Sequence, residues 1–159
     1  MQKLWAPWRE KFILEKKVKG CIFCKCLKEK KDQKNLILHR GKEAFVILNL
    51  YPYNSGHLMV VANRHKAKLE DLDQKEALEL MTLSQSWVKI LKKVLKPDGI
   101  NLGINLNQAS GAGIFEHVHI HIVPRWKGDT NFMPILTDTK VISVSLKSVY
   151  KKLFKAIKK

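Results

Sequence analysis

The chain has 159 residues, of which 45% are hydrophobic, an ordinary size and composition for one domain with its own apolar core. Lysine and arginine total 30 against 14 aspartate and glutamate residues, giving a formal net charge of +16 that attracts anionic partners. No nucleic-acid-binding motif accompanies this charge, so DNA or RNA is not the expected primary ligand. The sequence contains neither an apolar run long enough to cross a membrane nor a signal peptide, and we expect a cytoplasmic protein.

We expect a single domain over residues 1–159, with an N-terminal arm at 1–20 and a basic C-terminal extension at 140–159. Trp5 and Trp8 are spaced to pack together, and bulky aromatic side chains in a terminal arm usually dock on a core or on a partner subunit. The lysines of the C-terminal extension are interpreted as a solvated surface rather than as a binding site.

A tight knuckle is predicted at residues 21–26, followed by a charged loop or short helix at residues 28–34. Three cysteines crowd into the knuckle. This clustering suits metal ligation or reduced thiols better than a disulfide framework.

Short apolar runs separated by turn residues predict the strands of the domain. These runs lie at residues 36–39, 44–48, 57–62, 100–106 and 117–124, with a further candidate at 141–146. A polar, glycine-containing link joins the first two runs as a hairpin. The loop at residues 50–56, which contains Asn54 and Gly56, brings Asn49 and His57 to neighbouring strand ends.

One long helix is predicted to begin after Asp73, which forms a capping-box pattern with Glu76. Apolar residues then recur at helical spacing until Pro97 and Gly99 end the helix. A short C-terminal helix follows at residues 146–157. Strands arranged in hairpins around one long helix indicate an α+β fold with an antiparallel sheet of about five strands.

The run from His117 to Pro124 alternates histidine with apolar residues. Because residues two apart on a strand share a face, three imidazoles line one face and three apolar side chains fill the other. Clustered titratable groups mark functional sites. Two interpretations remain open from spacing alone: a histidine nucleophile for phosphoryl or nucleotidyl transfer, or a metal centre with imidazole ligands.

This run resembles the signature of the histidine triad (HIT) superfamily, in which three histidines alternate with apolar residues. Its flanks at residues 111–113 and 124–134, together with residues 4–9 and 21–24, are similar to the bacterial and archaeal branch of diadenosine tetraphosphate (Ap4A) phosphorylases and hydrolases. The likeness extends over nearly the whole chain. It implies a HIT-like α+β fold and a homodimer.

The resemblance assigns a catalytic role to three histidines. It implies that His119 attacks the α-phosphorus of a dinucleoside polyphosphate and forms a covalent adenylyl-histidine. His121 donates a hydrogen bond to a phosphate oxygen or to the leaving group, and His57 hydrogen-bonds within the histidine cluster. Inorganic phosphate or water then removes the adenylyl group.

Nucleotide and phosphate contacts are expected from the polar and glycine residues near the triad. The candidates are Asn49, Asn105, Asn107, Gly111, Gly113 and Trp126. In several relatives a serine, threonine or glutamine stands shortly before the triad. Here that stretch reads Ile114, Phe115 and Glu116, so the resemblance assigns no side chain to contact the leaving group.

Cys21 and Cys24 form half of a structural zinc site. Uridylyltransferase relatives complete such a site with a histidine placed like His65 and with the first histidine of their motif, here His117. Two thiolates and two imidazoles would satisfy tetrahedral zinc and make it a brace, not a catalyst. We expect no organic cofactor. The alternative ligands are Cys26 and His39.

The preferred function is therefore cleavage of dinucleoside polyphosphates such as Ap4A, with an adenine nucleotide as the ligand. An adenosine phosphoramidase using the same nucleophile is the first alternative. The others are a nucleotide- or nucleic-acid-binding protein without turnover, and a metal-dependent hydrolase in which all three histidines bind the metal.

Overall fold

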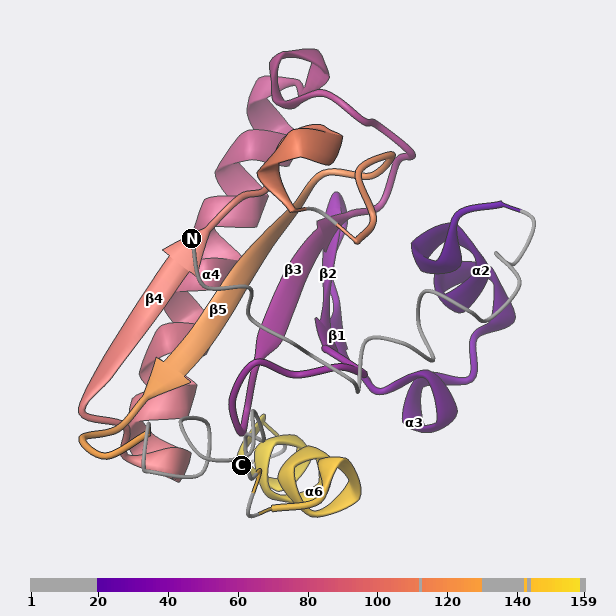
Figure 1. The fold of residues 1–159 in the computed structure, drawn as a ribbon. Helices are drawn as coiled ribbons and strands as arrows, with labels where there is room; N and C mark the ends of the chain where they lie inside the picture. The colour runs from indigo at the N-terminus through magenta and orange to yellow at the C-terminus, as the bar shows by residue number, and fades with distance from the viewer. Residues whose placement is uncertain (1–19, 112, 130–141, 143, 158–159) are drawn as a thin grey trace.

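The computed structural model describes residues 20–111, 113–129, 142 and 144–157, so all of the predicted N-terminal arm except Gly20 lies outside the described residues. The described residues form an antiparallel sheet with the strand order β1-β2-β3-β5-β4 (Figure 1). Its strands are β1 (Ile37–Arg40), β2 (Ala44–Leu48), β3 (Leu58–Ala62), β4 (Gly99–Gly103) and β5 (His119–Arg125). The α+β fold and its antiparallel sheet are confirmed, although β5 begins two residues after His117.

Helix α4 (Gln74–Leu95) lies along one face of the sheet (Figure 1). Its N-terminus carries the predicted capping box: the backbone N–H of Glu76 donates to the Asp73 carboxylate, and the N–H of Asp73 donates to the Glu76 carboxylate, each at 2.9 Å. The predicted C-terminal helix is α6 (Leu146–Ile157), and it packs beside α4. The helices of the described residues lack the length and apolar character needed to cross a membrane.

The two faces of the sheet carry separate apolar clusters, because side chains alternate along each strand. On the α4 and α6 side, Val60 of β3 and Ile120 of β5 pack against Leu80, Trp87 and other helix residues. On the opposite side, residues such as Met59 and Val61 pack with Phe23 of helix α2 (Ile22–Glu29). The central strands are therefore buried on both faces.

Two local predictions are wrong. Residues 22–29 form helix α2 rather than a knuckle, because they contain no glycine or proline and their apolar side chains pack on the sheet. The charged segment that follows contains the short helix α3 (Asp32–Asn35). The predicted strand at 141–146 is not formed by its described residues, since Val144 packs on the core outside any strand and α6 starts at Leu146. Short 3₁₀ turns occur at Leu69–Asp71 and Gln108–Ser110.

Candidate active site and metal site

The register of β3 and β5 places the histidines. His119 pairs with Val61, and His121 pairs with Met59, so both imidazoles lie on the face of the sheet that α2 covers. His57 immediately precedes β3 and is fully buried. The fold thus brings together three histidines from two segments that are far apart in the sequence.

The imidazole of His119 is held by its own strand. Its Nδ1 lies 2.7 Å from the carbonyl oxygen of His117. A carbonyl can only accept a hydrogen bond, so Nδ1 carries the hydrogen and Nε2 keeps a free lone pair. Burial lowers the pKa of His119, against the effect of this hydrogen bond, and keeps the ring neutral at pH 7. A neutral imidazole with a free Nε2 is the form that acts as a nucleophile.

A chain of hydrogen bonds sets the tautomer of His121. The backbone N–H of Tyr53 donates to His57 Nδ1 at 3.1 Å, so the hydrogen of His57 sits on Nε2. His57 Nε2 lies 2.9 Å from His121 Nδ1, which must then accept. The hydrogen of His121 is left on Nε2, where it can be donated to a ligand. Burial, followed by the charge of neighbouring histidines, lowers the pKa of His57 to about 3 and that of His121 to about 4.

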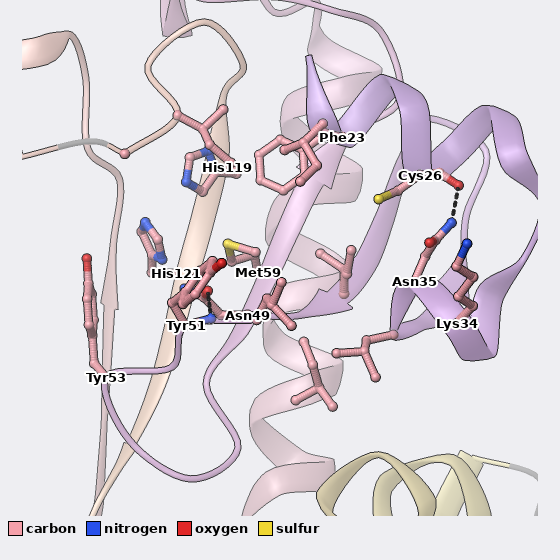
Figure 2. A pocket seen from close by; sticks show the side chains of 17 residues that line it. Phe23, Cys26, Lys34, Asn35, Asn49, Tyr51, Tyr53, Met59, His119 and His121 are labelled. Carbon is pink, nitrogen blue, oxygen red and sulfur yellow. Dashed lines mark hydrogen bonds between the residues drawn. The ribbon is translucent and has the colours of Figure 1, made fainter. Parts of the chain in front are cut away.

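A cavity of about 270 Å³ lies beside these histidines. Figure 2 shows His119 and His121 on one of its walls and the helical residues Phe23, Cys26 and Asn35 on another. Of the predicted nucleotide contacts, Asn49 and Gly113 line this cavity. Cavities that hold small organic ligands usually measure roughly 300–1,000 Å³, so this one is sized for one nucleoside of a dinucleotide.

Several predicted contacts lie outside this cavity. Its described lining includes neither Asn105 nor Asn107, nor Gly111. Trp126 follows the far end of β5, where its indole N–H donates to the carbonyl oxygen of Lys96 at 3.2 Å. Trp126 therefore packs against the C-terminal end of α4 instead of lining the cavity.

Sequence reasoning missed other lining residues. They include Ile22, Phe23, Lys34, Asn35, Leu50, Tyr51 and Tyr53. The helical spacing of Ile22, Phe23 and Cys26 is the signal that could have placed α2 against the histidine face. The side chain of Tyr53 has no comparable signal in the sequence, because its position depends on the path of the loop before β3.

A second cluster lies next to the histidine site. The ligand atoms of Cys21, Cys24, His65 and His117 all lie within 4.8 Å of one another. The sulfur–nitrogen distances are 3.2 Å from Cys21 to His117, 3.5 Å from Cys24 to His65 and 3.7 Å from Cys24 to His117. Bonds of about 2.3 Å to sulfur and about 2.0 Å to nitrogen in a tetrahedron put such atoms about 3.5 Å apart, so this group fits zinc.

The histidines of this cluster are oriented by groups behind them. His117 Nε2 lies 2.8 Å from the Ala62 carbonyl oxygen, so Nε2 carries the hydrogen and Nδ1 faces the two sulfurs. The neighbours of His65 are tied to α4, because Arg64 and Lys66 both form ion pairs with the buried carboxylate of Glu76. The alternative ligands Cys26 and His39 are not part of the group.

The chain is similar in sequence to known proteins. A model of the HIT domain matches residues 30–128. The chain is 41% identical over 150 residues to a Mycobacterium tuberculosis protein named AP-4-A phosphorylase, covering 89% of this chain and 77% of that protein. It is 32% identical over 93 residues to the asymmetrical bis(5'-nucleosyl)-tetraphosphatase of Schizosaccharomyces pombe, covering 58% of this chain and 50% of that protein.

Among solved structures, a zinc-bound histidine triad family protein from Mycobacterium smegmatis superposes with a TM-score of 0.71. The two chains are 22% identical, and the match covers 87% of this chain and 94% of the other, which shows a common fold. The predicted resemblance is confirmed by the HIT domain match over residues 30–128 and by the relative that is 41% identical over 150 residues. The chain therefore belongs to the HIT domain family.

Proposed function

We propose that the protein cleaves dinucleoside polyphosphates such as Ap4A at the α-phosphorus through a covalent adenylyl-His119, with phosphate or water as the acceptor. The relatives named AP-4-A phosphorylase and asymmetrical bis(5'-nucleosyl)-tetraphosphatase support an enzyme of the nucleotidyltransferase or hydrolase type. The strongly positive net charge of +16 favours the approach of such an anionic substrate.

The observation that carries this proposal is the hydrogen bond from His119 Nδ1–H to the His117 carbonyl oxygen, which leaves Nε2 free beside the cavity. The Nε2 lone pair forms a bond to the α-phosphorus. The bond from that phosphorus to the bridging oxygen breaks, and its electron pair leaves with the nucleoside polyphosphate. The imidazole becomes positively charged, and the carbonyl oxygen that accepts from Nδ1–H stabilises this charge.

His121 contributes the Nε2–H that its hydrogen bond with His57 fixes. A donor aimed at a developing negative charge stabilises the transition state more than the ground state. We place this donor on a non-bridging oxygen of the α-phosphate or on the leaving oxygen. In the second step water or phosphate attacks the same phosphorus, and the P–N bond breaks to regenerate neutral His119.

Two further parts of the site serve binding and support. Asn49 and Gly113 contact the nucleotide, since both line the cavity next to the histidines. A zinc ion held by Cys21, Cys24, His65 and His117 would cross-link α2 to the chain segments before β5 and after β3 without taking part in the reaction. Because His117 also supplies the carbonyl that orients His119, the two sites share one stretch of backbone.

The protein also forms a homodimer in this proposal. Strand β4 has a free edge in the described sheet, and apolar side chains are exposed near it and on α4. Leu102 of β4 is 47% exposed, and Leu78 and Met81 of α4 are 70% and 50% exposed. Such a patch is typical of a protein–protein contact. Light scattering should give the mass of a dimer, and Leu102→Lys should give a monomer.

The three free thiols fit a cytoplasmic location.

The covalent intermediate provides the decisive test. Ap4A labelled in both adenosines is mixed with the protein, and the reaction is quenched with acid-free denaturant to preserve the P–N bond. Label should remain on the wild-type chain and be absent from His119→Ala. Product analysis then separates the acceptors: ADP and ATP require phosphate, whereas AMP and ATP require water. Cleavage of an adenosine phosphoramidate without turnover of Ap4A would contradict the proposal.

A further inference from the structure

Tyr53 flanks the histidine pair from the side opposite to α2. Its ring lies 4.8 Å from the ring of His57 and 6.0 Å from that of His121, measured between centroids, at angles of 34° and 31°. The side chain lines the cavity and is 44% exposed. Tyr53 therefore lies between the buried histidines and solvent, where its ring forms part of the cavity wall.

The hydroxyl group of Tyr53 has no hydrogen-bond partner among the described residues. Asn35 donates to the carbonyl of Cys26, and the side-chain oxygen of Asn49, the residue proposed above to contact the nucleotide, accepts from the backbone N–H of Tyr51. Ile114, which lines the cavity just before the triad, has no polar side chain. The phenol is thus a polar group at the reaction centre that the protein itself leaves available.

The loop that carries Tyr53 is anchored on both sides. The backbone N–H of Tyr53 donates to His57, and the amide of Asn54 donates to the Pro124 carbonyl at 3.0 Å and to Asp129 at 2.8 Å. Gly56 has a φ of +78°, a backbone conformation that residues with a Cβ rarely adopt, so glycine suits the closure of this loop. These contacts position the phenol before any ligand binds.

The position of Tyr53 indicates which half of a dinucleotide it would contact. In Figure 2, His119 and His121 lie between Tyr53 on one side and Phe23 and Asn35 on the other. On that second side the cavity is lined by Ile22 and Phe23 of α2 and by Asn35 of α3, a largely apolar wall that suits the nucleoside that stays on the enzyme. A phosphate chain leaving from a phosphorus at His119 then emerges past His121, on the side of Tyr53.

We propose that the Tyr53 hydroxyl donates a hydrogen bond to the departing phosphate chain and selects substrates whose leaving group is a polyphosphate. This inference rests on the proposed function. As the P–N bond to His119 forms and the P–O bond breaks, negative charge grows on the leaving oxygen and its neighbouring phosphate. The phenol donates to this charge and keeps its proton, because a nucleoside polyphosphate leaves as a stable anion. Tyr53 thus supplies the leaving-group contact that Ile114, Phe115 and Glu116 do not.

The test compares two substrates with the same adenylyl group. The leaving group of Ap4A is ATP. The leaving group of the p-nitrophenyl ester of AMP is p-nitrophenolate, an anion of similar basicity that contains no phosphate. Tyr53→Phe keeps the ring against His57 and His121 and removes only the hydroxyl. We expect it to lower kcat/KM for Ap4A about tenfold, the effect of one hydrogen bond to a charged group, and to leave that for the ester within about twofold.

Tyr53→Leu serves as the structural comparison. It removes the ring that packs on both histidines, so both substrates should slow. If Tyr53→Phe slows both substrates equally, or neither, the leaving-group role is overturned while the adenylyl-His119 mechanism stands. If the wild-type protein forms no adenylyl-His119 from either substrate, the proposed function and this inference fall together.

Discussion

His117 and His119 differ by only two positions, yet opposite nitrogens of their rings are tied to the backbone. His117 donates from Nε2 to the Ala62 carbonyl, and this leaves Nδ1 to face the sulfurs of Cys21 and Cys24. His119 donates from Nδ1 to the His117 carbonyl, and this leaves Nε2 at the cavity. The carbonyl that each ring meets therefore decides whether the imidazole is arranged as a metal ligand or as a nucleophile.

Phe23 keeps the two functions apart. Its ring centroid lies 5.5 Å from that of His117 and 5.1 Å from that of His119, at interplanar angles of 84° and 60°. Phe23 stands between Cys21 and Cys24 in sequence, so the helix segment that supplies the thiols also supplies part of the wall of the cavity. Loss of His117 and loss of His119 should then produce different defects, and this contrast can be tested.

Replacing the nucleophile should have the largest effect. His119→Ala is expected to reduce turnover of Ap4A on the order of 10⁴-fold or more, because no other group can form the covalent intermediate. Its zinc content should stay that of the wild type, since His119 is outside the ligand group. Steady-state kinetics and metal analysis measure both. His39→Ala, at an exposed position on β1, is the matched control and should keep full turnover.

Disrupting the metal group should mainly affect stability. Cys24→Ala is expected to lose zinc and to lower Tm by roughly 10 °C, because a ligand at 1,000 times its Kd stabilises by about 4 kcal/mol and a chain of this size shifts about 2–4 °C per kcal/mol. A chelator should lower the Tm of the wild type equally and leave that of the variant unchanged. Cys26→Ser should retain zinc. Equal zinc content in Cys24→Ala and wild type would refute this metal site.

Much of this arrangement follows from local sequence pattern. The alternation of histidine with apolar residues predicts β5 with its two faces, and the Asp73 and Glu76 pair predicts the start of α4. The metal group was predicted from its CxxC spacing together with the family likeness, and its four residues do lie together. The alternation, the capping pair and the CxxC spacing are each read within one short segment and do not require knowledge of the fold, whereas His65 and His117 were added to the CxxC from the family likeness.

The remaining features depend on contacts between distant segments. Which nitrogen of His117 is free is set by the carbonyl group of Ala62, a residue of β3 that is far from His117 in the sequence. The ring of Tyr53 lies near His121 on a loop that Asn54 ties to the end of β5. Helix α2 was missed because closely spaced cysteines favour a knuckle, whereas packing of Phe23 on the sheet stabilises a helix. Tertiary packing of this kind overrides local preference.

His121 extends the contrast, because its tautomer is set by another imidazole and not by a carbonyl. His57→Ala should reduce kcat for Ap4A roughly 100-fold, since His121 Nδ1 loses its donor and the hydrogen is no longer fixed on Nε2. KM should change less. His57→Gln, whose amide can donate in place of Nε2–H, should recover some of the loss. An unchanged kcat in His57→Ala would show that His121 needs no partner to hold its tautomer.

The pH dependence should show the smallest change. An exposed histidine loses its neutral form near pH 6.5, but burial lowers the pKa of His119 below that value and the pKa of His121 to about 4. The folded chain therefore keeps His121 neutral between pH 7.5 and 6.0 and loses the neutral form of His119 only below pH 6.5, so the fall of kcat/KM for Ap4A should have its midpoint below pH 6.5. In the unfolded chain the same histidines take up protons near pH 6.5. The free energy of unfolding should consequently fall as the pH drops below 6.5, since protons then bind the unfolded state preferentially. A pH–rate profile and denaturant unfolding at several pH values measure the two effects. A loss of kcat/KM with a midpoint at pH 6.5, in a chain that is still fully folded, would mean that the nucleophile titrates as an exposed imidazole. The effect assigned here to the burial of His119 would then be wrong.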